Sequence, residues 1–288
     1  MLTLKKIDDV RRSLKIIRER KTCIGFVPTM GALHEGHLEL IRRAKRECGF
    51  VVVSIFVNPT QFGQGEDFQK YPRSIEEDLD KCRQAGVDLV FNPEREEMYP
   101  EHSLTTVQVA KFTDKLCGEF RPGHFTGVTT VVTKLFNIVM PDIAYFGQKD
   151  AQQALVIRRM IQDLNFPVEL RICPTVRSES GLALSSRNRY LSESELRQAA
   201  CLYQSLQSAK RLINQGNKDG SAIMQSMRKQ IELAGPCQIQ YIGIVDMNTF
   251  DELAKIDRPV LIALAVRIGP ARLIDNIILD SEGNETII

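Results

Sequence analysis

Short apolar runs alternate with amphipathic helical patterns from the start of the chain to Val176, and this alternation constrains the fold more than any other feature. Several of the runs are apolar at consecutive positions, which is typical of strands covered on both faces. Strands and helices that alternate on this scale predict an α/β fold, with a doubly wound, Rossmann-like parallel sheet and right-handed crossovers. The expected strands are residues 22–29, 50–57, 87–91, 143–147 and 168–176.

Between these strands, apolar residues recur at spacings of three and four, as on the buried face of a helix. The expected helices are residues 36–48, 74–86 and 150–164. The second of them opens with Ser74 and Glu77, a pair typical of a capping box. The run 104–112 is a weaker strand candidate within a long insertion.

The pattern changes after Val176. A Ser- and Arg-rich loop is followed by two helical patterns and then by three strand-like runs joined by short turns. Ser192 and Glu195 form a second expected capping box at the start of the first of these helices. We therefore expect two domains, a Rossmann-like domain over residues 1–176 and a smaller α+β domain, which would act as a lid, over residues 177–288.

Composition excludes some classes of protein. The formal net charge is +2, from 38 basic and 36 acidic side chains, so no nucleic-acid partner and no membrane surface is expected. No run is long and apolar enough to be expected to span a membrane, and the first residues lack a signal-type apolar core. The seven cysteines are scattered, which fits reduced thiols, so a cytoplasmic location is expected.

The stretch "PTMGALHEGH" joins the first of these strands to the helix after it. Backbone N–H groups at a helix start attract anions, and Gly31 and Gly36 let phosphates approach the backbone. His34 and His37 lie three residues apart and could donate hydrogen bonds to phosphate oxygens. The alternatives are that the two histidines only cap or pack against the helix, or that they bind zinc. Zinc is disfavoured because no paired cysteines or carboxylate cluster lie nearby in the sequence.

Polar segments follow the expected strands at the edge where a doubly wound sheet binds ligands. They contain neutral amides, a lysine, an acidic residue and hydroxyl and guanidinium groups: Asn58, Gln61, Lys149, Asp150, Ser185, Ser186 and Arg187. This set suits a nucleoside triphosphate and a small polar co-substrate. There is no Walker A motif and no G-x-G-x-x-G after the strand at 22–29, so neither a P-loop enzyme nor a dinucleotide-binding protein is expected.

Seven motifs in order resemble the pantoate–β-alanine ligase (pantothenate synthetase) family: "PTMGALHEGH", "VSIFVNPTQF", "YPRS", "RPGHFTGV", "PDIAYFGQKDAQQ", "GLALSSRN" and "RLIDNI". The resemblance implies ATP-dependent condensation of (R)-pantoate with β-alanine through an enzyme-bound pantoyl adenylate, giving pantothenate, AMP and pyrophosphate. It also implies a requirement for Mg²⁺, carried on the ATP phosphates with no protein ligand assigned, and a homodimer formed through the larger domain. Two departures from the family pattern are Ser180 and the "GPAR" segment at 269–272.

The resemblance also implies roles for matching residues. His37 would be the proton donor, and His34, Lys149 and Arg187 would act on the phosphates. Gln61 and Gln153 would hold pantoate, with Gln61 also near β-alanine and Asn58 supporting that pocket. Asp150 would bind ribose, and the Val176 backbone would contact adenine. The complete ATP site would comprise Met30, Gly31, Ala32, Leu33, His34, Glu35, Gly36, His37, Gly147, Gln148, Lys149, Asp150, Val176, Leu184, Ser185, Ser186 and Arg187.

Three other functions remain as alternatives. The first is a nucleotidyltransferase of the wider superfamily that shares the His-x-Gly-His motif. The second is a tRNA synthetase, which is disfavoured because no extra anticodon-reading domain is evident. The third is a nucleotide-binding module without catalysis. The "RPGHF" segment, with Arg121 and His124, is expected to border either the site or an interface, and His102 is expected to have no role.

Overall fold

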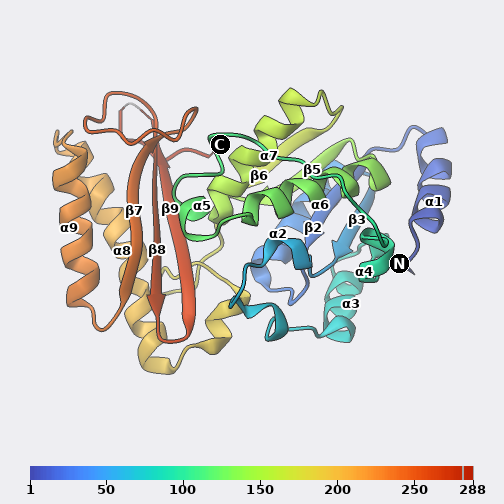
Figure 1. Cartoon of the computed structure of the whole chain (residues 1–288), viewed down its shortest axis with the longest axis horizontal. Helices are drawn as coiled ribbons and strands as arrows, with labels where there is room; N and C mark the ends of the chain where they lie inside the picture. Colours follow the sequence, from blue (N-terminus) through green and yellow to red (C-terminus); the bar gives the residue numbers. More distant parts are fainter. Residues whose placement is uncertain (281, 288) are drawn as a thin grey trace. The chain divides into compact units, whose positions relative to one another are not determined.

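The structure, a computed structural model, describes residues 1–280 and 282–287. The chain divides into two compact units (Figure 1). The first contains Met1–Thr113, Arg121–Gly147 and Gln152–Cys173, and the second contains Asp114–Phe120, Gln148–Ala151 and the chain from Pro174 onward. The last segment of the second unit therefore begins close to the predicted boundary after residue 176. Two short segments from before that boundary also belong to this unit.

The first unit is built on a six-stranded sheet in which neighbouring strands pair in parallel. Its strands are β1 (Leu2–Leu4), β2 (Ile24–Thr29), β3 (Phe50–Ile55), β4 (Leu89–Phe91), β5 (Ile143–Gly147) and β6 (Glu169–Cys173), in the order β1-β4-β3-β2-β5-β6. The parallel α/β fold predicted from the alternation is confirmed. The short edge strand β1 was not predicted.

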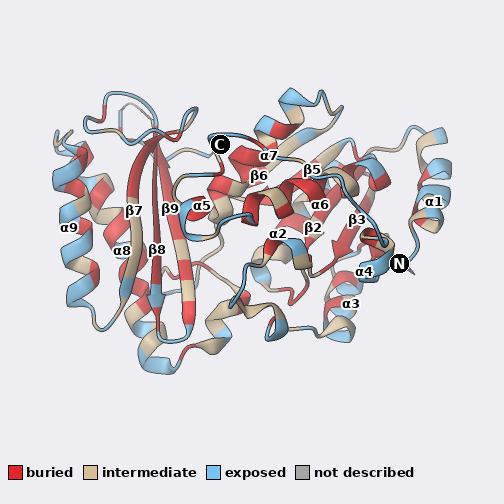
Figure 2. Cartoon of the chain, viewed as in Figure 1, coloured by how far each residue is buried: buried red, intermediate tan, exposed pale blue. Residues whose placement is uncertain are grey.

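Among the described residues, six α-helices lie wholly or almost wholly in the first unit: α1 (Ile7–Glu19), α2 (Glu35–Glu47), α3 (Ile75–Gln84), α4 (Arg95–Met98), α6 (His124–Val139) and α7 (Ala151–Asp163). The short α5 (Cys117–Phe120) belongs to the second unit. Consecutive residues of a strand point to opposite faces of a sheet. On β2, Val27 packs in a cluster with Ile41 of α2, whereas the ring of Phe26 meets that of Phe136 on α6. Helices therefore cover both faces of the sheet, and Figure 2 shows the central strands β2 and β3 largely buried.

The second unit contains α8 (Glu193–Asn214), α9 (Gly220–Leu233) and an antiparallel sheet of β7 (Gln238–Asp246), β8 (Val260–Ile268) and β9 (Ala271–Leu279). The two helices and three strands lie where the periodicity predicts them. The predicted capping box is confirmed, since Ser192 Oγ accepts the Glu195 N–H while the Glu195 carboxylate accepts the Ser192 N–H. The departure at 269–272 contains the β8–β9 turn, where Gly269 adopts φ +51°.

Two local predictions were wrong. The segment 104–112 is not a strand, because threonine side chains of α6 satisfy its backbone: Val107 donates to Thr130 Oγ1 and accepts from Thr129 Oγ1. Ser74 precedes α3, but its side chain makes no capping hydrogen bond. No helix within the described residues is long and apolar enough to cross a membrane.

Candidate functional site

The strand order reverses between β2 and β5, because the chain proceeds from β2 to β3 and β4 on one side and from β5 to β6 on the other. In doubly wound sheets, ligands bind at the carboxyl ends of the strands beside such a switch point. The chain leaves β2 at Thr29, directly before the histidine motif, and leaves β5 at Gly147, directly before Lys149 and Asp150. The topology thus places both predicted phosphate segments after the two strands that flank the switch point.

His34 and His37 form a reciprocal cap at the start of α2. The Nδ1 of His34 accepts the N–H of Gly36 at 3.2 Å, and the Nδ1 of His37 accepts the N–H of His34 at 3.3 Å. The ring centroids lie 4.1 Å apart. A Cβ on Gly36 would lie 2.9 Å from the Cε1 of His34, so only glycine leaves room for this ring. The capping role is therefore real, and it fixes both imidazoles at a helix N-terminus.

The capping bonds determine where each neutral ring carries its hydrogen. A neutral imidazole has one donor and one acceptor nitrogen. Because both Nδ1 atoms accept from backbone amides, the hydrogen of each neutral ring is assigned to Nε2. Two N–H donors are thus held on adjacent half-buried rings beside the N-terminus of α2, where the helix dipole favours an anion.

Asp78 fixes the loop that leads to this pair. Its carboxylate on α3 accepts the N–H groups of Ala32 at 2.8 Å and Leu33 at 2.7 Å, and Lys81 donates to the Leu33 carbonyl. Gly31 and Ala32 have φ values of +83° and +50°, so the loop uses left-handed backbone at two successive residues. Such a conformation persists only when the surrounding structure holds it in place. The two hydrogen bonds to Asp78 hold the loop in this conformation.

The Asp78 carboxylate is almost entirely buried, with 1% of the residue exposed. Burial raises its pKa above the ordinary value, while the hydrogen bonds from Leu33 and Ala32 and the charge of Lys81 oppose that rise. Sequence reasoning missed Asp78 as a site residue. Its contacts are with backbone groups 45 and 46 residues away, and no motif spacing records them.

The short 3₁₀ helix η1 (Pro59–Gln61) carries the predicted pantoate residue Gln61, and Asn58 caps it. The Asn58 Nδ2 donates to Gln61 Oε1 at 3.1 Å and to the Gly127 carbonyl at 3.0 Å, while its Oδ1 accepts from Tyr99 Oη at 2.9 Å. Gln61 Nε2 lies 2.9 Å from the sulfur of Met30, a residue predicted in the ATP loop. Asn58, Gln61 and Met30 thus lie together in the first unit.

The paired glutamines near the start of α7 have different surroundings. Gln152 is buried and donates to the Phe112 carbonyl at 3.0 Å, which gives it a structural partner. Gln153, the predicted pantoate residue, is half-buried at the next position.

The remaining predicted ATP residues belong to the second unit, in two segments. In the first segment, the Nζ of Lys149 lies 3.9 Å from an Asp150 carboxylate oxygen. The side chain of Asn276 on β9 donates to the carbonyls of Gln148 and Lys149, both at 2.9 Å. Asn276 thereby fixes the backbone that carries Lys149, although the sequence suggested no role for it.

In the second segment, Val176 and Leu184 are brought together, because the Leu184 N–H donates to the Val176 carbonyl at 3.0 Å. Arg177 holds this turn by donating two bonds to the Asp275 carboxylate, at 2.6 and 3.0 Å, and by lying 3.9 Å from the centre of the Tyr203 ring. Asp275 and Asn276, adjacent on β9, therefore anchor the two predicted nucleotide segments of this unit.

The loop continues into η4 (Ser186–Tyr190), where Ser185 is the N-cap and accepts the N–H of Arg187 at 3.3 Å. Ser186 is buried. Ser180, the departure noted in the sequence, is exposed, and its hydroxyl lies 2.9 Å from that of Ser178.

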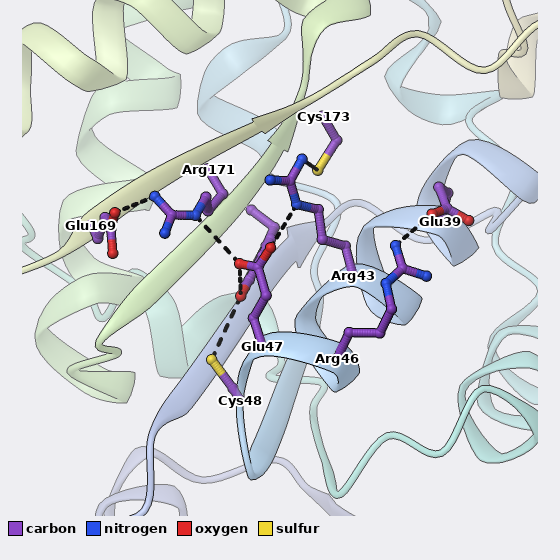
Figure 3. Close-up of polar contacts among 9 residues, drawn as sticks. Glu39, Arg43, Arg46, Glu47, Cys48, Glu169, Arg171 and Cys173 are labelled. Atoms are coloured by element: carbon purple, nitrogen blue, oxygen red, sulfur yellow. Dashed lines mark hydrogen bonds and ion pairs between the residues drawn. The ribbon is translucent and has the colours of Figure 1, made fainter.

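The far end of α2 is tied to the sheet by Glu47 (Figure 3). Its carboxylate accepts from Arg43 on the same helix at 2.8 Å, from Tyr145 on β5 at 3.0 Å and from Arg171 on β6 at 3.3 Å. Since α2 presents the histidine pair at its other end, these bonds help to fix the helix against the strands beside the switch point.

No group of three or more His, Cys, Asp or Glu side chains that could hold a metal ion occurs within residues 1–280 and 282–287.

Comparison with known proteins gives a consistent result. The family model described as pantoate-beta-alanine ligase matches residues 2–278. The pantothenate synthetase of Caldicellulosiruptor bescii is 51% identical over 282 residues, covering 98% of this chain and 100% of that protein.

Two solved structures extend the similarity to the fold. Pantothenate synthetase from Thermus thermophilus superposes with a TM-score of 0.91 at 46% identity, covering 96% of this chain and 99% of that one. Pantoate-beta-alanine ligase from Francisella tularensis, described as complexed with beta-gamma ATP and beta-alanine, gives a TM-score of 0.81 at 36% identity, with 96% and 97% coverage.

Proposed function

The chain belongs to the pantoate–β-alanine ligase family, and on that premise we propose which of its residues perform the reaction. The enzyme condenses (R)-pantoate with β-alanine in an ATP-dependent reaction that yields pantothenate, AMP and pyrophosphate through pantoyl adenylate. The main support for the assignment of residues is the histidine pair. It is fixed at the N-terminus of α2, with its Nε2–H groups as donors.

In the first half-reaction, a carboxylate oxygen of pantoate attacks the α-phosphorus of ATP, and the bond to the β-phosphate breaks as pyrophosphate leaves. Charge develops on the phosphate oxygens during this step, so donors placed in advance stabilise the transition state. We assign His37 as the proton donor to the departing phosphate and His34 as a phosphate contact. Lys149 and Arg187 add positive charge, which suits them to the triphosphate.

In the second half-reaction, the amine of β-alanine attacks the acyl carbon of the mixed anhydride, the bond to AMP breaks, and the nitrogen loses a proton. We assign Gln61 and Gln153 to pantoate. Neutral amides orient a carboxylate without the strong ion pair that would lower its nucleophilicity. Asn58, capping η1, holds the Gln61 side chain through its amide.

Within the nucleotide site, we assign Asp150 to ribose and the Val176 backbone to adenine. The segment from Leu184 to Arg187 is assigned to the triphosphate. The Ser185 hydroxyl and the Arg187 guanidinium are groups that can donate hydrogen bonds to phosphate oxygens.

We assign Mg²⁺ as the metal that accompanies ATP. Mg²⁺ commonly binds through substrate phosphates and keeps several waters, so it needs few protein ligands. When bound, it would neutralise charge on the phosphate oxygens. No step is assigned to a metal ligand of this chain.

The proposal includes a homodimer and a cytoplasmic location. All seven cysteines are free thiols, which fits a reducing compartment. The oligomeric state is measurable by sedimentation velocity.

The deciding experiment is an assay with ATP, pantoate and β-alanine. AMP release that requires all three substrates is the expected result, whereas a stable nucleotidyl product formed without β-alanine would refute the ligase assignment. Pantoate-dependent exchange of labelled pyrophosphate into ATP isolates the first half-reaction. His37→Ala and Lys149→Ala are expected to lower this exchange by roughly 100-fold or more, as losses of transition-state donors do.

A further inference from the structure

We propose that His124 and Arg121 are positioning residues. They bind the backbone of η1 and so orient the Gln61 side chain toward pantoate. The proposal rests on the assignment of Gln61 to pantoate. It gives a role to the "RPGHF" segment, for which the sequence left two possibilities open.

The first observation is that both side chains reach the same backbone carbonyl. His124 Nδ1 lies 2.8 Å from the Gln61 carbonyl oxygen, and Arg121 donates to that oxygen at 3.3 Å. His124 is a buried residue at the start of α6, and Gln61 is buried as well. Two donors from one segment therefore converge on the residue whose side chain is assigned to pantoate.

The second observation is the tautomer that these contacts require. A carbonyl oxygen can only accept, so the His124 Nδ1 must carry its hydrogen. The Nε2 of the same ring lies 3.0 Å from Arg121, which can only donate, so Nε2 must accept. Arg121 thereby orients the imidazole with its donor toward Gln61, as an outer partner orients a metal-binding histidine.

The third observation is that Arg121 is itself held. It donates to both oxygens of Glu66, at 2.7 and 2.6 Å, in a two-bonded arrangement of fixed geometry. Glu66 lies beyond η1 in the chain, so Arg121 and Glu66 together clamp the segment that carries Gln61.

The fourth observation is the close approach of α6 and η1. A Cβ on Gly127 would lie 2.4 Å from the Thr60 carbonyl oxygen and 2.6 Å from the Gln61 nitrogen. The Gly127 carbonyl also accepts from the Asn58 amide at 3.0 Å. The "RPGHFTGV" motif therefore presents three residues, Arg121, His124 and Gly127, to one short helix, which is the pattern of a scaffold for that helix.

A fixed Gln61 backbone limits the directions in which its side chain can point. The side-chain amide of Gln61 accepts from Asn58 through Oε1 and contacts the Met30 sulfur through Nε2. Loss of the His124 bond would let η1 shift while the histidine pair on α2 stays in place. The expected signature is a defect in pantoate binding without a matching defect in ATP binding.

The test uses the full-length enzyme and pantoate-dependent exchange of pyrophosphate into ATP. His124→Leu removes the hydrogen-bond donor and puts an apolar side chain of similar width in its place. It is expected to raise the KM for pantoate by roughly three- to tenfold, as the loss of one hydrogen bond does, and to leave the KM for ATP within about twofold. His124→Asn keeps an amide donor near the position of Nδ1 and is expected to recover most of the loss.

Thr129→Val is the matched control. Thr129 is buried on the same helix, and its hydroxyl lies within hydrogen-bond distance of the Val107 and Phe125 carbonyls, not of η1. This variant is expected to change thermal stability but not the KM for pantoate. If His124→Leu does not fold, Arg121→Lys, which keeps the charge but loses the fork, carries the same expectation.

A folded His124→Leu enzyme with an unchanged KM for pantoate would overturn the inference, as would an equal rise in the KM values for pantoate and ATP. Gln61→Ala separates this outcome from failure of the proposed function. If Gln61→Ala raises the KM for pantoate and His124→Leu does not, the positioning role is wrong while the assignment of Gln61 stands. If Gln61→Ala has no effect, the assignment itself is wrong.

Discussion

Asp78 holds Leu33 across 45 residues of sequence, through a hydrogen bond of 2.7 Å from the Leu33 N–H to a buried carboxylate oxygen. The other oxygen of the same carboxylate accepts the N–H of Ala32 at 2.8 Å. Both residues directly precede the histidine pair. The orientation of the two imidazoles therefore depends on helix α3 as well as on the helix that carries them.

Asp78→Asn is expected to damage catalysis more than folding. An asparagine offers one acceptor oxygen, so one of the two backbone N–H groups would face an NH₂ group instead. Hydrogen bonds to charged groups contribute about 1.5–3 kcal/mol, so we expect kcat/KM for ATP to fall by roughly 10- to 100-fold. Steady-state kinetics with pantoate and β-alanine saturating measures this change.

Asp80→Asn is the control for that variant. Asp80 lies two residues further along α3, is exposed, and pairs only with the exposed Arg83 among the contacts described. Exposed pairs of this kind contribute little, so wild-type kinetics are expected. Equal losses in the two variants would mean that α3 acts through its general stability and not through the loop.

Gly36→Ala is expected to displace the His34 ring. The added methyl group would lie 2.9 Å from Cε1, closer than real contacts allow, and 3.0 Å from Nδ1, which is also a tight contact. Alanine normally favours a helix by up to about 1 kcal/mol over glycine, so stability should hold or rise while activity falls. Thermal unfolding and pyrophosphate exchange, measured together, check this divergence. Arg46→Ala, an exposed substitution on the same helix, should leave the exchange unchanged.

Much of the fold was predictable because its elements carry strong local periodicity. The strands β7, β8 and β9 match their predicted runs closely. Helix α6 was missed for a physical reason. Its sequence "TGVTTVVTKLF" is rich in β-branched residues, which favour strands, and the helix is buried on nearly every side. Tertiary burial, which one sequence does not display, decided its conformation.

The residues of the candidate site also divide into those that the sequence could identify and those that it could not. Polar residues directly after β2, β3 and β5 could be singled out, because parallel strands present their carboxyl ends at one edge. Asp78, His124 and Asn276 could not be given roles. Each acts on backbone groups far away in the chain, as Asn276 does on Gln148 at a separation of 128 residues. Contacts of that kind depend on the topology of the fold and produce no recognisable residue spacing in the sequence.

Asn276→Ala is expected to raise the KM for ATP by roughly three- to tenfold, because two hydrogen bonds to the Gln148 and Lys149 carbonyls would be lost. Asn276→Asp should be worse, since it would bring a buried carboxylate toward two carbonyl oxygens. The KM for β-alanine should change little. Asn284→Ala, an exposed asparagine in the same unit, is the control. An unchanged KM for ATP in Asn276→Ala would show that the Lys149 segment is held without this side chain.

Glu66 provides a prediction for the dependence of stability on pH. Burial raises its pKa, but the hydrogen bonds and charge of Arg121 outweigh that effect, so the pKa lies below the ordinary 4.5. A carboxyl whose pKa is lowered on folding stabilises the protein above its unfolded pKa, and this contribution is lost as pH falls through the folded value. The stability difference between the wild type and Glu66→Gln should therefore be largest near neutral pH and should shrink below pH 4.5. Urea unfolding of both proteins at a series of pH values measures the difference. A difference that stays constant from neutral pH to well below that value would mean that the ion pair with Arg121 does not contribute through its charge.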